Sequence, residues 1–329
     1  MTGLGSRTRF QQRGVAVLTA ILVVAMATIL AVELAWDLNL DIRRTENLLL
    51  HAQARQFALG AELLAADALR TDYENDIEDG GACDYLEEDW NTELALPFEG
   101  GSVRGRLTDL QGRFNLNNLI IEGQKNEAAY DQFVRLLEIL GLDPRLGAKV
   151  LDWIDPDQVA GLGGGEDDIY TSRTPPYRTA NTWFTTTTEL LAVDGFIDPN
   201  DPDNPSFRTL ERYVAALPPG QKINVNTAED PVLLSMATDP RATNAEDLRV
   251  NRHYCDLLTS NAGEKVAFMD DAQDIVAPKF ANANLEISSN YFQLKVLVSL
   301  GSARLTMYSL LYRDANGFVT TSLRYFDTK

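Results

Sequence analysis

The feature that most constrains this chain is an uninterrupted apolar run from Val15 to Val32, VAVLTAILVVAMATILAV. Its eighteen residues include nothing more polar than Thr19 and Thr28. A helix with a rise of 1.5 Å per residue would make this run ~27 Å long, close to the thickness of the hydrocarbon core of a bilayer. Three arginines precede the run, and positive charge on that side keeps the leader in the cytoplasm. We therefore expect one membrane span, with the rest of the chain exported.

Three interpretations of this span remain open from the residues. A secretory signal peptide would be cleaved after the small residues Ala25-Met26-Ala27, although the apolar run continues beyond them. A plain signal anchor would stay uncleaved. The third interpretation depends on Gly14, which ends the charged leader immediately before the helix. Such a leader resembles that of type IV pilins and pseudopilins, which implies that a prepilin peptidase cuts after Gly14 and methylates Val15.

The fifth mature position differs from that of most pilins. Most members of the family have a glutamate there, whereas this chain has Thr19. In the family, that carboxylate neutralises the N-terminal amine of a neighbouring subunit, because a lone charge in hydrocarbon is costly. A subunit without it is a poor candidate for repeated stacking inside a filament, but it can cap one.

Helical spacing continues past the apolar run. Mostly apolar residues recur every three or four positions from Leu38 as far as Ala66, with charged residues mostly between them. We expect one helix of about 55 residues, ~80 Å long at 1.5 Å per residue, half in lipid and half against a globular domain. From Thr71 to Gly101 the chain becomes acidic, which predicts an irregular loop. The alternating pattern from Ser102 to Leu110 predicts a strand.

Three motifs then occur in order: DLQGRFNLNNL at 109–119, PPYRTAN at 175–181 and INVNTA at 223–228. Together with the leader they resemble the type II secretion system protein K family, whose members are minor pseudopilins. The resemblance covers nearly the whole chain. It implies a non-enzymatic subunit that caps the tip of the periplasmic pseudopilus, helps to start its assembly, and associates with the minor pseudopilins I and J. It also implies anchorage in the inner membrane, with the body in the periplasm.

The expected fold class is α+β: a pilin-like long N-terminal helix packed on an antiparallel sheet, with a large inserted helical domain. Helical patterns predict the insertion, including a helix over 206–216, and three alternating stretches near the C-terminus predict strands. Short helices are also expected over 244–258 and 265–274. The expected parts are a leader (1–14), a transmembrane and stalk helix (15–70), a first pilin-like part (71–126), the inserted helical domain (127–218), and the remaining helices with the C-terminal sheet (219–329).

A cluster of six carboxylates lies within seventeen residues of the expected insertion, on a loop made flexible by glycines. Calcium takes six to eight oxygen ligands, so such a loop can wrap a cation, although a solvated acidic loop would have the same composition. No EF-hand pattern is present. The resemblance favours calcium, because protein K members are associated with it in this domain. The expected ligands are Asp155, Asp157, Glu166, Asp167 and Asp168. Asp152 is expected to support them from its helix.

The net charge of the chain is −19, and removal of the leader would make it −22. A field of this sign repels phosphate backbones, so nucleic acid is a disfavoured partner and divalent cations are favoured. The motif INVNTA also resembles the start of helix-hairpin-helix DNA-binding modules. The residues that follow it contain no Gly-x-Gly hairpin, and asparagines that complete turns and helix caps are a sufficient explanation.

Cys83 and Cys255 are the two cysteines of the chain. An oxidising periplasm makes a disulfide between them plausible, and two free buried thiols are the alternative. The two histidines are far apart in the sequence, so they indicate neither a zinc site nor a Ser-His pair, and we expect no active site. The alternative function is a membrane-anchored periplasmic calcium-dependent binding protein or hydrolase unrelated to filaments.

Overall fold

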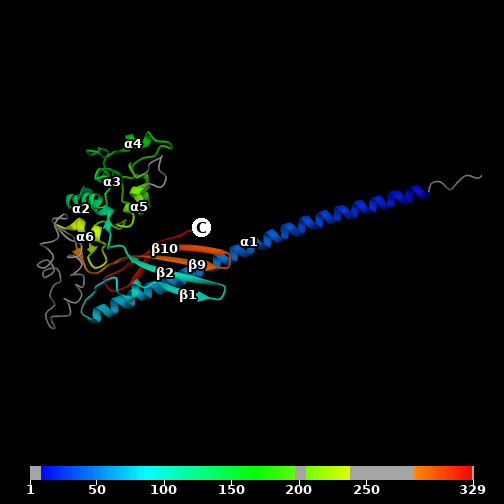
Figure 1. Cartoon of the computed structure of the whole chain (residues 1–329), viewed down its shortest axis with the longest axis horizontal. Coiled ribbons are helices and arrows are strands. Elements are labelled where there is room, and N and C mark those ends of the chain that lie inside the picture. Colours follow the sequence, from blue (N-terminus) through cyan, green and yellow to red (C-terminus); the bar gives the residue numbers. More distant parts are fainter. Residues whose placement is uncertain (1–8, 80, 197–204, 238–284, 328–329) are drawn as a thin grey trace, which may run out of the picture.

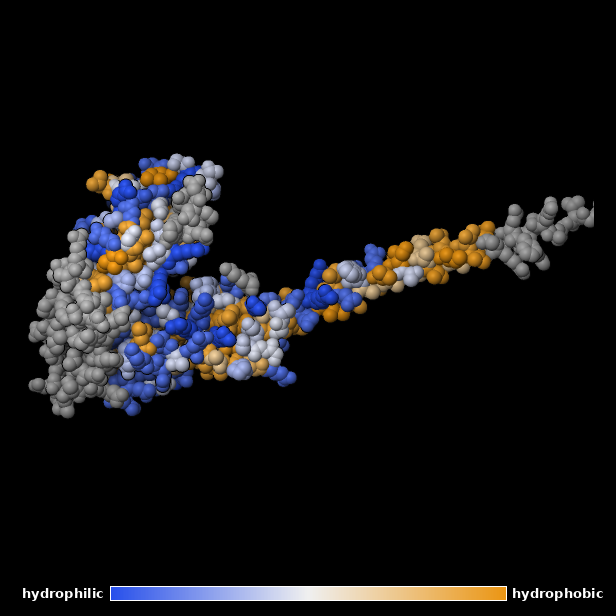
Figure 2. Space-filling view, viewed as in Figure 1, coloured by the Kyte–Doolittle hydropathy of each residue, from blue (hydrophilic) through white to orange (hydrophobic). Residues whose placement is uncertain are grey.

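A computed structural model describes residues 9–79, 81–196, 205–237 and 285–327. Helix α1 (Arg9–Asp79) has 71 residues and projects far beyond the rest of the molecule (Figure 1). From Val15 to Trp36 its large apolar side chains are exposed, and this part of the helix appears mostly orange in Figure 2. The helix is long and apolar enough to cross a membrane. The exposed rod is consistent with an anchor, because apolar side chains in water would carry a large hydration cost.

The C-terminal half of α1 packs against a sheet. Small side chains at three- and four-residue spacing face that sheet and are buried: Ala54, Ala58, Ala61, Ala65 and, at the end of the row, Leu69. Alanine has almost no side-chain bulk, so the helix backbone lies close to the strands. Glu62 on the same helix accepts hydrogen bonds from Ser309, Thr321 and Arg324, which join the helix to the last two strands.

The sheet has five antiparallel strands in the order β1-β2-β9-β10-β11. Their bounds are β1 Leu94–Phe98, β2 Gly101–Asp109, β9 Tyr291–Leu300, β10 Ala303–Arg313 and β11 Val319–Asp327. Alternate residues of β2, β9 and β10 are buried, which is the pattern of strands with one face on a core. The expected α+β fold, with a long helix on an antiparallel sheet, is confirmed.

The prediction of an irregular loop over 71–101 is wrong at both ends. Helix α1 continues to Asp79, because no glycine or proline lies between Gly60 and Gly80 in the sequence. Residues 94–98 form the edge strand β1, with only partly buried ends and an exposed middle. Pro97 lowers the strand signal in the sequence but is tolerated at an edge. A short 3₁₀ turn, η1 (Asp89–Asn91), buries Trp90 between these elements.

The helical part has its own core. It contains α2 (Glu127–Ile139), α3 (Leu146–Ile154), α4 (Asp167–Thr171), η3 (Thr187–Ala192) and α5 (Pro205–Leu210). Its largest buried side chains include Phe114, Phe133, Tyr170 and Phe196. The predicted helix over 206–216 is too long: α5 ends at Leu210, and Val214–Ala215 forms β6, which pairs with β3 (Phe114–Asn115) in parallel. The predicted helices over 244–258 and 265–274 lie outside the described residues.

Short elements complete the described fold. They are η2 (Leu116–Leu119), β4 (Ile120–Ile121), β5 (Gln124–Lys125), β7 (Ile223–Asn224), α6 (Asp230–Met236) and β8 (Leu285–Glu286), with β7 and β8 paired in parallel. In Figure 1 the helical part lies at the end of the sheet farthest from the projecting N-terminal rod. The body is therefore bulkiest at the end opposite the apolar helix.

The motifs at 109–119 and 223–228 each place a buried asparagine that bonds to chain segments distant in the sequence. The Asn117 amide donates to the carbonyl oxygens of Phe184 (2.9 Å) and Leu217 (2.8 Å), and it is buried. Asn224, also buried, donates to the Asp84 carbonyl at 3.0 Å and accepts from the Asn226 amide. Buried amides with several partners hold loops in one arrangement. The predicted turn is present at Asn224, and Asn115 caps η2, but the N-cap of α6 is Glu229, whose side chain makes no capping hydrogen bond.

Candidate metal centre

Three carboxylates converge where α3 ends and α4 begins. Asp152 lies in the last turn of α3, Asp155 follows that helix, and Glu166 precedes α4. One oxygen of each lies within 4.8 Å of the others. Asp152 and Glu166 are only 2% and 4% exposed, and Asp155 is partly buried. Pro156 stops α3, and the chain then returns through a glycine-rich loop, which brings Glu166 back to the helix end.

The glycine loop folds around Asp152. One of its carboxylate oxygens, Oδ2, accepts hydrogen bonds from the backbone N–H groups of Gly161 (2.8 Å) and Gly165 (2.9 Å). A Cβ atom on Gly164 would lie 2.0 Å from that oxygen, so any larger residue there would displace the carboxylate. Asp152 was expected to support the ligands from the N-terminal end of its helix, but it lies in the last turn of α3, and its carboxylate is part of the cluster.

The other two carboxylates have oxygens with no internal partner. Among the described residues, nothing hydrogen-bonds to Asp155 Oδ1 or to either oxygen of Glu166, and all three atoms are buried. Burial, together with neighbouring negative charges, raises the pKa of Asp155 to about 6 and that of Glu166 to about 7. Buried carboxylate oxygens without donors are costly unless a cation or a proton compensates them. They carry the case for a metal ion here.

Two further residues lie close to this cluster. Asn181 donates its backbone N–H to the Trp153 carbonyl (3.0 Å) and its side-chain amide to the Asp157 carbonyl (3.1 Å). Its Oδ1 atom is buried and, within the described chain, accepts no hydrogen bond. The Asp157 side chain is exposed, and its charge contributes to the raised pKa values of Asp155 and Glu166. An amide oxygen is a ligand that calcium accepts, and we did not expect Asn181 in this role.

The remaining expected ligands lie elsewhere in the loop. Asp167 Oδ1 accepts hydrogen bonds from the backbone N–H and the hydroxyl of Thr179, each at 3.0 Å, and its other oxygen lies 3.6 Å from Arg178. Asp168 is exposed. The structure therefore brings together Asp152, Asp155 and Glu166, with Asp157 nearby, and places Asp167 and Asp168 on the first turn of α4.

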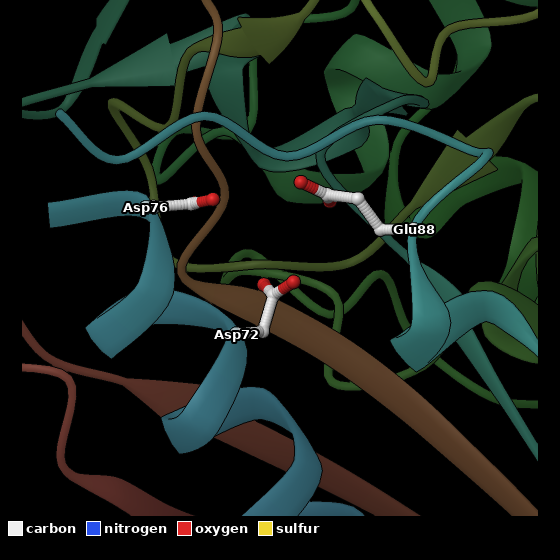
Figure 3. Close-up of side chains that lie close together, drawn as sticks. All are labelled: Asp72, Asp76 and Glu88. Atoms are coloured by element: carbon white, nitrogen blue, oxygen red, sulfur yellow. The ribbon is translucent and has the colours of Figure 1, made fainter. Parts of the chain in front are cut away.

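A second acidic cluster lies at the C-terminal end of α1 (Figure 3), where the carboxylates of Asp72, Asp76 and Glu88 point toward one another. Burial, reinforced by neighbouring carboxylates, raises the pKa of Asp72 to about 7 and that of Glu88 to about 8. These side chains already have protein partners. Asp72 pairs with Arg313 at 3.2 Å, and Glu88 accepts from the Trp90 indole at 2.6 Å. This cluster is therefore part of the packing around Arg313.

Arg313 is the most deeply buried cation of the described chain, at 1% exposure. It donates to both carboxylate oxygens of Asp84, which is 0% exposed, and to the carbonyl oxygens of Ser289 (3.0 Å) and Leu69 (3.1 Å). The network joins β10, the end of α1 and the segment after it. No local pattern in the sequence predicts this network, since Arg313 and Asp84 are 229 residues apart.

The structure places the other expected site residues as follows. Gly14 lies in the first turns of α1, and Val15, 61% exposed, follows it in the same helix. Cys83 is buried beside Asn226, and the described residues include no free cysteine. Cys255 lies outside the described residues.

A long helix with an exposed apolar half, laid over an antiparallel sheet, defines a pilin-like subunit, and here that subunit has a large additional helical part with an acidic centre. The model of the family described as type II secretion system (T2SS), protein K, matches residues 112–219. Type II secretion system protein K of Pseudomonas aeruginosa is 35% identical over 328 residues, which cover 95% of this chain and 92% of that protein. The protein of the same name from Pectobacterium carotovorum is 29% identical, with 92% and 93% covered.

The solved structures include a similar chain. It belongs to the crystal structure of the GspK-GspI-GspJ complex of the type 2 secretion system of enterotoxigenic Escherichia coli. The TM-score is 0.65 at 23% identity, and the match covers 87% of this chain and 99% of that one. The present chain belongs to the type II secretion system protein K family. It is a minor pseudopilin, a structural subunit of protein secretion and not an enzyme.

Proposed function

We propose that this chain caps the tip of the periplasmic pseudopilus and helps to start its assembly. The observation that carries the proposal is the position of the helical part, at the end of the sheet opposite the apolar rod (Figure 1). A subunit inside a filament needs room above its sheet for the next subunit. The bulky helical part at the end of the sheet opposite the rod obstructs such stacking. The apolar N-terminal part of α1 remains free to join a bundle of similar helices from other subunits.

We further propose that α1 crosses the inner membrane once, with the body in the periplasm, after a prepilin peptidase has cut the leader between Gly14 and Val15. The exposed apolar half of α1 and the arginines before it support this orientation. Mass spectrometry of the mature N-terminus tests it. A methylated Val15 at the N-terminus supports the proposal. An intact Met1, or an N-terminus at Thr28, would instead support the anchor or the signal peptide.

The proposed direct partners are the minor pseudopilins I and J. The solved complex that resembles this chain contains proteins of those names from E. coli, and the partly exposed edge strands β1 and β11 offer backbone groups for pairing. Co-purification of the three full-length proteins in detergent tests the association. Recovery of this chain alone, at concentrations where the other two pair, would contradict it.

We propose that the acidic centre binds calcium. Asp152, Asp155 and Glu166 would supply carboxylate oxygens, with the amide oxygen of Asn181 and the carboxylate of Asp157 as further candidates. Calcium prefers several oxygen ligands of mixed type, and the unpartnered oxygens supply them. Asp167 and Asp168 stay predicted ligands that reach the ion only if the first turn of α4 moves. Calorimetric titration of calcium into the full chain distinguishes the ligands of the acidic centre from those on α4. Asp155→Asn should abolish the heat of calcium binding, whereas Asp168→Asn should leave it unchanged.

A disulfide between Cys83 and Cys255 and the limits of the inserted domain, 127–218, are also proposals. Peptide mapping of the non-reduced protein tests the disulfide: a peptide pair that contains both cysteines and separates on reduction is expected. Two alkylated single peptides from unreduced protein would show free thiols. A disulfide that closes so long a loop would stabilise the fold by up to about 5 kcal/mol in the chain-entropy model.

A further inference from the structure

The five-stranded sheet has a second face, which is turned away from α1. Alternate side chains of β2, β9 and β10 lie in the core beneath α1, as Val296 does. Because successive side chains of a strand point to opposite faces, the residues between them lie on the outer face of the sheet. Four of these residues are exposed cations: Arg104 and Arg106 on β2, Lys295 on β9 and Arg304 on β10.

Positive charge is not balanced on this face. Arg106 borders a pocket that Asp109 and Glu229 also line, so its charge is partly offset. Among the described residues, no ion pair or hydrogen bond reaches the side chain of Arg104, Lys295 or Arg304. Asp327 is the one carboxylate at an outward position of the described strands β2, β9, β10 and β11. Since the whole chain has a net charge of −19, this face is a local exception to the overall charge.

An exposed leucine lies among these cations. Leu297, 40% exposed, is directly opposite Arg104 on β2 and two residues after Lys295 on its own strand. Beside it, the rings of Tyr308 and Tyr325 stack with their centres 4.8 Å apart, and Tyr325 is 48% exposed. Tyrosine and arginine are enriched where proteins contact each other. We call the following six residues the basic face: Arg104, Lys295, Leu297, Arg304, Tyr308 and Tyr325.

The position of the basic face disfavours a lipid headgroup as its ligand. The turn between β9 and β10 lies against α1, since a Cβ atom on Gly301 would be 3.5 Å from the Leu50 side chain. Leu50 follows Val32, the end of the apolar run, by eighteen residues, or ~27 Å of helix. The headgroup layer extends only ~5–8 Å beyond the hydrocarbon core. With α1 across the membrane as proposed, the basic face stands beyond the reach of the bilayer.

We propose that the basic face docks an acidic segment of another protein, with carboxylates paired to Arg104, Lys295 and Arg304 and an apolar side chain on Leu297. Charge complementarity between the cations and the carboxylates would speed the encounter and select the partner. Arg104 and Arg304 lie two strand spacings apart, ~10 Å, so an extended segment contacts both more readily than a small anion. The exposed leucine and tyrosine favour a polypeptide over a phosphate polymer, which has no apolar group to place on Leu297. The sheet edges β1 and β11 stay free for the subunits proposed above.

The test uses the full chain in detergent and fluorescence anisotropy of the labelled peptide Gly-Glu-Asp-Phe-Glu-Asp-Gly with an amidated C-terminus. We expect saturable binding that weakens as NaCl rises from about 50 to 500 mM, because salt screens exposed charges. The double variant Arg104→Gln/Lys295→Gln should weaken binding at least about 5-fold. The matched control is Arg43→Gln/Arg44→Gln, which removes two exposed positive charges from α1. It should leave the affinity within about 2-fold.

A second pair of measurements tests the apolar contact. Leu297→Ala should weaken binding of the peptide that contains Phe about 2- to 5-fold, and it should leave the weaker binding of a peptide with Gly in place of Phe unchanged. A loss of equal size for both peptides would contradict the contact between Leu297 and an apolar side chain. Thermal melts check that every variant is folded.

Other results would overturn the whole proposal. They are absence of saturable binding up to millimolar peptide, equal affinity of the wild type and the folded Arg104→Gln/Lys295→Gln variant, and equal binding of a peptide with Gln and Asn in place of Glu and Asp. Polyphosphate of matched charge that competes more strongly than the unlabelled peptide would identify a phosphate polymer as the ligand instead. Self-association of the chain in analytical ultracentrifugation, abolished by Arg104→Gln/Lys295→Gln, would identify a second copy as the occupant and contradict a different protein.

Discussion

Glu166→Gln should change the stability of this protein in opposite directions with and without calcium. In the metal-free protein, the Glu166 carboxylate is buried beside Asp152 and Asp155, and neither of its oxygens has a partner within the described residues. Glutamine has the same shape, carries no charge, and can donate to a neighbouring carboxylate. The metal-free variant should therefore be more stable than the wild type. With calcium the order should reverse, because the variant has lost a charged ligand.

The magnitude follows from the pKa of Glu166. Burial, reinforced most by the charge of Asp155, raises that pKa from 4.5 to about 7. A carboxyl group with a raised pKa in the folded state stabilises the fold at low pH, and the stabilisation is lost as pH rises through the folded-state value. A difference of about 2.5 pKa units corresponds to ~3–4 kcal/mol at most, since one pKa unit equals about 1.4 kcal/mol. Structural relaxation and entry of water reduce this free-energy difference. We therefore expect the free energy of unfolding of the metal-free variant to exceed that of the wild type by about 1–3 kcal/mol at pH 8, and by much less at pH 5.

Urea unfolding of the full chain in detergent, followed by tryptophan fluorescence, measures both effects. Without metal, in excess EDTA at pH 8, the midpoint of the variant should exceed that of the wild type. With calcium at about 100 times its dissociation constant, the wild type should gain about 2.7 kcal/mol and the variant little. Glu138→Gln serves as the control, because this residue is exposed on α2 away from the cluster. It should change the stability by no more than about 0.5 kcal/mol in either condition.

Two outcomes would refute the reasoning. If Glu166→Gln destabilises the metal-free protein at pH 8, its carboxylate has a compensating partner. If calcium stabilises the variant as much as the wild type, Glu166 is not a ligand.

Three further predictions concern the rest of the described chain. Arg313→Met should cost about 3–5 kcal/mol in urea unfolding because it leaves the Asp84 carboxylate buried without its cation; a loss below 1 kcal/mol would show that water reaches that site. Gly164→Ala should weaken calcium binding in calorimetry at least about 10-fold by displacing the Asp152 carboxylate, and an unchanged affinity would contradict the packing of the loop on it. The free energy of unfolding of the metal-free protein should fall as pH rises from about 5 to 8, since burial raises the pKa of Glu88 to about 8. Glu88→Gln should reduce this dependence on pH. The same dependence on pH in the wild type and the variant would exclude the Glu88 carboxyl group as the cause.

The parts of the fold that were predictable carry a strong local pattern. The apolar run starting at Val15 predicts the exposed rod, and alternation of apolar residues predicts strands β2 and β9. Strand β1 was missed because Pro97 and its exposed middle remove the alternation that identifies a strand. The predicted helix over 206–216 failed because β6 gains its partner, β3, from a segment about a hundred residues away.

The acidic centre was predictable in composition but not in detail. The concentration of carboxylates and glycines predicts the loop, and Glu166 does meet Asp155 there. Spacing along the chain cannot show that Asp167 is held by Thr179 or that Asn181 lies beside Asp157, because both contacts depend on how the loop returns. The unpartnered oxygens of the buried carboxylates, which carry the metal proposal, become visible only in three dimensions.

The most direct test of the central proposal is the number and position of copies in an isolated pseudopilus. The chain, tagged at its C-terminus and produced at its native level, would be counted per filament by single-molecule fluorescence and located by immunogold electron microscopy. The proposal predicts one copy per pseudopilus, at one end. Copies distributed along the shaft, or filaments of normal number and length that lack the chain altogether, would contradict it.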